Sequence, residues 1–229
     1  MRIERKLAVE FIGAFFLVLT VGLATRSAGT LAPLAAGITL MVMVFAGGHI
    51  SGGHYNPAVS TAVMLRGKLS PRDWLAYVIT QLIAGCAAAG VVAALGYRFA
   101  TPAHTAGIGT MLVAEFLFAF ALCYVVLNVA TSRGTEGNSF YGLAIGFTIA
   151  TGAFAVGPLS GGAFNPAVAL GATLMGLFNW SHIWVYFVAE FLGGAVAAGA
   201  FLLTQGAGEQ PVAEQPARLG SDRSTRLAA

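Results

Sequence analysis

An eight-residue block occurs twice in this chain, and its repetition constrains the fold more than any other feature. Residues 52–59 read Gly-Gly-His-Tyr-Asn-Pro-Ala-Val, and residues 161–168 read Gly-Gly-Ala-Phe-Asn-Pro-Ala-Val. A single Asn-Pro-Ala string carries little information, but both copies share the Gly-Gly prefix and the Val suffix and lie in matching apolar surroundings. The repetition predicts a duplicated chain whose two halves place these blocks equivalently.

Composition assigns the chain to the membrane. Hydrophobic residues make up 57% of it and charged residues only 9%, far from the averages of soluble domains. Apolar stretches long enough to cross about 30 Å of hydrocarbon as helices cover approximately 7–25, 31–48, 74–97, 111–130, 140–157 and 183–204. We therefore predict an all-α protein with six transmembrane helices in the lipid bilayer of the inner (plasma) membrane.

The duplication extends beyond the short blocks. Residues 34–39 parallel 143–148, and residues 77–85 parallel 186–194. Each half, about 5–97 and 110–204, thus holds three spans and one block. An odd number of crossings inserts the second half from the opposite face, so the repeats are inverted. We predict one channel domain over 1–205, followed by a polar, disordered tail over 206–229.

Each block is followed by an apolar run too short to span, residues 58–65 and 167–177. Asparagine suits the N-cap of a helix and proline its first position. We therefore expect two re-entrant half-helices that begin at the blocks and approach each other from opposite sides of the membrane.

The stretches before the half-helices, residues 49–55 and 158–164, carry glycines and are expected to be irregular. Irregular backbone at membrane depth is tolerated where it lines a wet cavity. If the asparagine oxygens act as caps, their amide N–H groups remain free to face a lumen, and the half-helix dipoles add positive charge there. Such a site accepts neutral hydrogen-bonding molecules and repels protons and cations.

Basic residues orient the chain, because Lys and Arg near short loops gather on the cytoplasmic side. On the other side of a six-span arrangement lie only Arg26 and Arg98. The basic residues on the first side are Arg2, Arg5, Lys6, Arg66, Lys68, Arg72, Arg133, Arg218, Arg223 and Arg226. We expect both termini in the cytoplasm. This asymmetry accounts for the net charge of +3, so no nucleic-acid partner is inferred.

With both blocks at these places in a six-span inverted repeat, the chain resembles the aquaporin family, also called the major intrinsic proteins, over roughly residues 5–204. The resemblance implies a homotetramer with one pore per subunit and passive flow of water and small neutral solutes. It makes the two blocks the pore motifs Asn56, Pro57, Ala58, Asn165, Pro166 and Ala167.

The chain departs from the family pattern after the second motif, where Val168 stands in place of the usual arginine. By analogy with family spacing, the other selectivity-filter positions are Ala36, Ala153 and Gly162. Water-selective relatives tend to carry an aromatic residue and a histidine at the first two. The small set predicts a wide filter that passes glycerol, urea or uncharged metalloid acids such as arsenous acid. The alternative is that Phe154 or Phe164 fills the space and keeps the pore selective for water.

Glutamates within the spans are expected to serve as scaffold. The resemblance implies that Glu10 and Glu115 support the re-entrant loops by accepting backbone N–H bonds, and we place His49 near the cytoplasmic mouth beside them. Glu190, opposite Gln81 in the repeat, is expected to be a packing or loop anchor.

Other function classes fit the sequence less well. A coupled secondary transporter would normally need an ion-coordinating cluster at mid-membrane, where the candidates are two neutral asparagines. No nucleophile, metal site or cofactor loop can be placed at one depth, which argues against an enzyme. We predict no metal and no cofactor.

Overall fold

The computed structural model describes residues 2–97, 99 and 106–205. Over these residues the chain is helical and forms no strand. The α-helices are α1 Ile3–Ser27, α2 Ala32–Ser51, α3 Pro57–Leu65, α4 Pro71–Ala94, α5 Ile108–Thr131, α6 Tyr141–Ser160, α7 Pro166–Met175 and α8 Ile183–Gln205. Short 3-10 turns cover Gly29–Leu31, Arg133–Thr135 and Trp180–His182. Among the features expected from the sequence, the tail 206–229 and Arg98 lie outside the described residues.

Six of the described helical segments are long and apolar enough to cross a membrane, which confirms the six predicted spans. Their outward faces are apolar. Leu75, Ile79 and Ile83, one turn apart on α4, are each about half exposed. Such a stripe of large exposed aliphatic side chains fits a hydrocarbon environment and would be a liability in water.

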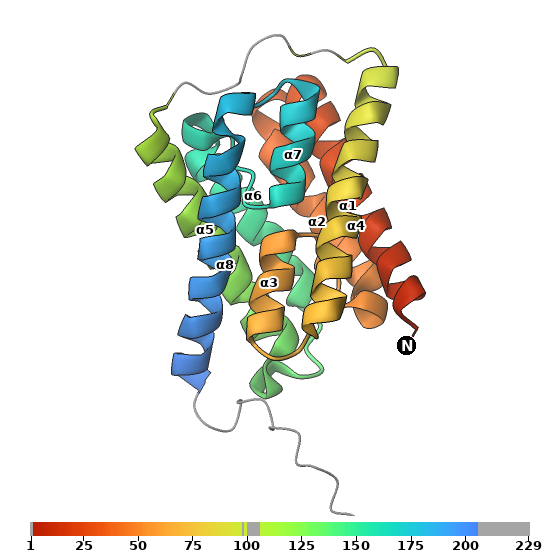
Figure 1. Cartoon of the computed structure of the whole chain (residues 1–229), viewed down its shortest axis with the longest axis vertical. Coiled ribbons are helices and arrows are strands. Elements are labelled where there is room, and N and C mark those ends of the chain that lie inside the picture. The colour runs from red at the N-terminus through yellow and green to blue at the C-terminus, as the bar shows by residue number, and fades with distance from the viewer. Residues whose placement is uncertain (1, 98, 100–105, 206–229) are drawn as a thin grey trace, which may run out of the picture.

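The helices pair as two related halves, α1 to α4 and α5 to α8. Within each half the first helix packs against the second and the fourth, as α1 does with α2 and α4. The half-helices are exchanged between the halves: α3 packs extensively on α8 of the second half, and α7 packs on α4 of the first half. Figure 1 shows α7 above α3 in the middle of the view, with α8 on one side and α4 on the other. This exchange builds the inverted repeat into one bundle.

Two glycines allow the exchanged half-helices to approach closely. A Cβ atom on Gly85 of α4 would lie 2.6 Å from the carbonyl oxygen of Ala167, in the first turn of α7. A Cβ on Gly194 of α8 would lie 2.6 Å from the carbonyl oxygen of Ala58, in the first turn of α3. Any larger residue at either position would push a half-helix away from its support.

Helices α2 and α6 extend further than the sequence pattern predicts. They continue to Ser51 and Ser160, past the expected ends at 48 and 157, and α6 includes Pro158. Gly52 and Gly161 terminate them, with φ of 95° and 94°. Only glycine adopts this backbone readily, so the irregular segments shrink to the residues between these glycines and the asparagines.

Candidate pore and its supporting network

Each half-helix begins at its Asn-Pro-Ala motif, as predicted. The Oδ1 atom of Asn56 accepts hydrogen bonds from the N–H groups of Ala58 (2.8 Å) and Val59 (3.4 Å). The Oδ1 atom of Asn165 accepts one from Ala167 N–H (3.0 Å). A proline follows each asparagine at the first helical position, where a missing N–H leaves no bond unmade. Both motifs are thus N-caps.

The asparagine amides link the two halves directly. Asn56 Nδ2 donates to the carbonyl oxygen of Phe164 (2.9 Å), and Asn165 Nδ2 donates to the carbonyl oxygen of Tyr55 (3.0 Å). The expectation that both amide donors stay free is therefore corrected. One N–H of each NH₂ group holds the opposite loop, and one remains for another acceptor.

The residues that receive these bonds have an unusual backbone. Tyr55 and Phe164 both have φ of 50°, in the left-handed region where residues with a Cβ seldom lie. Each is fixed at both ends, because its N–H binds a buried glutamate and its carbonyl accepts from the opposite asparagine. The two loops are therefore held in a strained but fully determined conformation.

Glu10 supports the first loop, as the resemblance implies. Its side chain is fully buried. Its Oε1 accepts from Ser51 Oγ (2.6 Å) and His54 N–H (3.0 Å), and its Oε2 accepts from Tyr55 N–H (2.7 Å) and Gln81 Nε2 (2.8 Å). Four donors around one carboxylate satisfy its lone-pair sites.

Glu115 supports the second loop in the same way. Its Oε1 accepts from Ser160 Oγ (2.6 Å) and Ala163 N–H (3.1 Å), and its Oε2 accepts from Phe164 N–H (2.8 Å). Behind it, Tyr186 Oη donates to the carbonyl oxygen of Ser160 (2.6 Å). The matching pair in the first half is Tyr77 and Ser51 (2.8 Å).

These serines and tyrosines complete the support and were not expected from their residue types alone. The signal that could have found them is their repetition, since Ser51 and Ser160 precede the two Gly-Gly pairs and Tyr77 and Tyr186 open equivalent stretches. A polar residue kept in both halves of a duplicated membrane protein indicates a shared structural bond.

The two histidines beside the first motif have different surroundings. His54 is buried, and its Nδ1 lies 3.1 Å from Ser60 Oγ. His49 is exposed at the end of α2, and no hydrogen bond joins it to the loop within the described residues. The support expected from His49 comes instead from Ser51, whose Oγ accepts from Gly53 N–H (3.1 Å).

The four expected filter positions are small and lie on three helices and one loop. Ala36 on α2 and Val168 in the first turn of α7 are buried. Gly162 lies against α6, where a Cβ built on it would be 3.2 Å from Ala153 Cα. The structure thus brings Ala153 and Gly162 together.

The aromatic residues that could narrow the filter differ in their packing. The Phe164 ring is buried and packs on Phe118, with centroids 5.4 Å apart, while its edge lies over Gly152. Phe154 on α6 is half exposed. Phe164 therefore fills a packed site of its own, and any movement into a lumen would break that packing.

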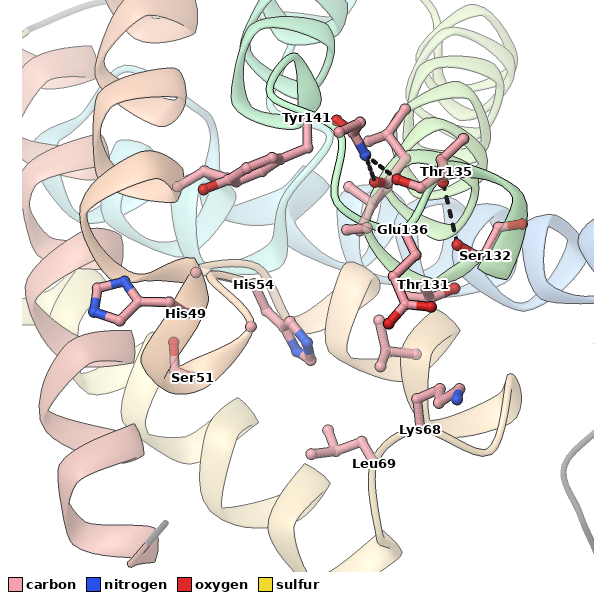
Figure 2. A pocket seen from close by; sticks show the side chains of 18 of the residues that line it. His49, Ser51, His54, Lys68, Leu69, Thr131, Ser132, Thr135, Glu136 and Tyr141 are labelled. Carbon is pink, nitrogen blue, oxygen red and sulfur yellow. Dashed lines mark hydrogen bonds between the residues drawn. The ribbon is translucent and has the colours of Figure 1, made fainter.

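A cavity of about 730 Å³ lies at the end of the bundle where α1 begins and α5 ends. Figure 2 shows that its labelled side chains come from the end of α2 and the loop that follows it, from the turn between α3 and α4, from the end of α5 and the turn beyond, and from the start of α6. Its lining includes Ser51 and His54 next to the first motif, and the charged residues Lys6, Lys68, Arg133 and Glu136. The cavity therefore leads from the surface to the first re-entrant loop. Over the part of the chain described here, no group of three or more His, Cys, Asp or Glu side chains could hold a metal ion.

Comparison with known proteins agrees with this architecture. The family model described as "Major intrinsic protein" matches residues 3–201. The chain is 37% identical over 206 residues to "Glycerol uptake facilitator protein-like 6" of Lactiplantibacillus plantarum, a match that covers 85% of this chain and 95% of that protein. It is 35% identical over 237 residues to "Aquaporin NIP1-3" of Oryza sativa subsp. japonica, covering 97% and 81%.

A solved structure shows the same fold. The aquaglyceroporin from Plasmodium falciparum superposes with a TM-score of 0.75 and 19% identity, covering 87% of this chain and 96% of that one. Six membrane-spanning helices, two capped half-helices and a family match over nearly the whole chain lead to one assignment. The chain belongs to the major intrinsic protein family, and it is a multi-pass membrane channel, not an enzyme.

Proposed function

We propose that this channel conducts small neutral solutes, such as glycerol, urea and uncharged metalloid acids, together with water, through a wide filter that lacks arginine. The observation that carries the proposal is the filter set Ala36, Ala153, Gly162 and Val168. None of these side chains carries a charge, a hydrogen-bond donor or a ring. A filter lined by these side chains is wider and less polar than a filter that contains a guanidinium group and an aromatic ring.

The proposed path runs from the cavity beside His54, past the first re-entrant loop, to the asparagines and then to the filter. At mid-membrane, the second N–H of Asn56 and of Asn165 serves as a donor to the passing molecule. The N-termini of α3 and α7 meet at the same level, and their dipoles oppose the entry of cations. Two helix ends and two neutral amides suit a hydroxyl-bearing solute and not an ion.

Two observations support this choice of solutes. The Lactiplantibacillus plantarum relative is named as a glycerol uptake facilitator protein. In this chain the Phe164 ring is packed against Phe118, and its Cζ atom lies 3.4 Å from a Cβ built on Gly162, so the ring borders the filter and would lose its contact with Phe118 if it moved further inward. Glycerol therefore heads the set of candidate solutes.

The assembly and its placement are part of the same proposal. The chain forms a homotetramer with one pore per subunit in the plasma membrane, and both termini face the cytoplasm. Lys6, Lys68 and Arg133 gather at one end of the bundle, which the distribution of basic residues in membrane proteins assigns to the cytoplasmic side. The channel domain covers 1–205, and 206–229 form a polar tail.

Stopped-flow light scattering on proteoliposomes tests the function. Vesicles mixed with hyperosmotic glycerol, urea or arsenous acid should shrink as water leaves and then swell again as the solute enters. Rapid shrinkage without subsequent swelling for all three solutes would instead indicate a narrow water channel. Protein-free vesicles provide the baseline, and collapsing sodium and proton gradients should leave the solute flux unchanged.

A further inference from the structure

The two re-entrant loops are supported by the same glutamate but by different second residues. In the first half, Gln81 Nε2 donates to Glu10 Oε2 (2.8 Å) and to Ser60 Oγ (3.0 Å). The repeat places Glu190 where Gln81 stands and Ala169 where Ser60 stands. The second loop therefore has a carboxyl group where the first has an amide donor.

Glu190 is fully buried, and its carboxyl group meets fewer donors than that of Glu10. Its carboxyl group lies beside that of Glu115 and faces the backbone of Asn165. Neither of its oxygens has a hydrogen-bond partner of good geometry within the residues that the structure describes. Ala169 supplies no hydroxyl, and Ala163 supplies no ring nitrogen in place of His54.

Two adjacent carboxylates cannot both be ionised in such a site, because like charges repel strongly where water is excluded. Glu115 already accepts hydrogen bonds from Ser160, Ala163 and Phe164, whereas no donor among the described residues meets a Glu190 oxygen with full hydrogen-bond geometry. The proton of the pair therefore belongs on Glu190. A protonated carboxyl carries one O–H donor, which is the group missing from this position.

We infer that Glu190 is a neutral carboxylic acid that donates its O–H to the Glu115 carboxylate, and that it positions the second re-entrant loop as the Gln81 amide positions the first. It is a positioning residue, since it acts through Glu115 on Phe164. The carbonyl of Phe164 accepts the hydrogen bond from Asn56. The proton shared by Glu190 and Glu115 is thereby linked, through Phe164, to the positions of Asn56 and Asn165.

Among the residues that the structure describes, the groups around this pair offer no compensating cation. Helix α5 contributes Cys123 as well as Glu115, and on α8 the Tyr186 hydroxyl already donates to Ser160. The sequences of α3 and α7 contain no ionisable side chain. Arg66, which caps α3, lies over the Phe201 ring, about 16 Å along α8 from Glu190 at 1.5 Å per residue. Removal of the proton at alkaline pH would therefore leave two unscreened negative charges behind the loop.

Infrared spectroscopy of the full-length protein in lipid tests the inference and requires no solute flux, so its outcome is separate from that of the proposed function. The wild type at neutral pH should show the carbonyl band of a protonated carboxylic acid, shifted in D₂O and lost in Glu190→Gln. Gln81→Glu combined with Ser60→Ala is the matched variant, because it creates in the first half a carboxyl pair without the neighbouring Ser60 hydroxyl, and it should add a second such band. A wild type without the band, or a band that persists in Glu190→Gln, would overturn the inference.

Water permeability provides the second readout. Glu190→Gln should conduct like the wild type at neutral pH, because the amide restores the donor, whereas Glu190→Ala should lose permeability. At alkaline pH the wild type should lose permeability reversibly and Glu190→Gln should not. The same pH profile in both proteins would show that the proton does not position the loop.

Discussion

Asn56 and Phe164, which are 108 residues apart, are joined by a hydrogen bond from the Asn56 amide to the Phe164 carbonyl oxygen (2.9 Å). The bond from Asn165 to Tyr55 (3.0 Å) repeats it in the opposite direction. Each asparagine therefore caps its own half-helix and holds the loop of the other. The centre of the channel is a closed set of bonds in which neither half is complete without its counterpart.

Replacing Asn165 with alanine should destabilise the whole protein. The substitution removes a cap of about 1 kcal/mol and leaves the buried Tyr55 carbonyl unpaired at about 1–3 kcal/mol. The midpoint temperature of thermal unfolding in detergent should fall clearly. Asn179→Ala is the control, because Asn179 also caps a helical turn through its side chain but at an exposed site. Equal losses for both variants would mean that the cross-link contributes nothing.

Replacing Asn56 with aspartate should open the channel to cations. The carboxylate can still accept the bonds that Asn56 Oδ1 receives from Ala58 and Val59. It cannot donate to Phe164, and it places a negative charge where two helix dipoles otherwise repel cations. Sodium and proton fluxes into proteoliposomes should rise above those of the wild type. Unchanged cation fluxes at normal water permeability would place Asn56 outside the conduction path.

Replacing Gly85 with alanine should disrupt the packing of α7 on α4. The new Cβ would lie 2.6 Å from the Ala167 carbonyl oxygen, and such overpacking typically costs about 1–3 kcal/mol. Gly90 lies on the same helix with nothing within 4 Å of its built Cβ, so Gly90→Ala should be neutral or stabilising by up to about 1 kcal/mol. Thermal unfolding of the two variants measures the difference. A Gly85→Ala protein as stable as Gly90→Ala would contradict the close packing.

The spans and half-helices could be predicted from the sequence because local rules determine them. Length and hydropathy identify the crossings, and an Asn-Pro pair marks where each half-helix starts. The ends of α2 and α6 were predicted too early, since weak helix formers such as Gly48 and Pro158 stay helical near a terminus. The positive φ of Gly52 and Gly161 sets the actual ends, and tertiary packing imposes that geometry.

The hydrogen-bond partners could be predicted only where the two halves agree. Glu10 and Glu115 stand at equivalent positions, and both support loops as expected. The bond from Asn56 to Phe164 could not be inferred, because it depends on how closely the halves meet. The position of Glu190 beside Glu115 likewise follows from the packing of α8 on α5, which no local pattern specifies.

Val168→Arg tests the width of the filter most directly, through the ratio of glycerol to water permeability measured on one preparation of proteoliposomes. The wild type should conduct both, and the guanidinium should lower the ratio by about tenfold, equivalent to about 1.4 kcal/mol of added barrier for glycerol. Val168→Leu adds bulk without charge and controls for disturbed packing. In Val168→Arg the ratio of glycerol to water permeability should fall while water permeability is retained. A wild type that excludes glycerol, or an unchanged ratio in Val168→Arg, would contradict a wide filter.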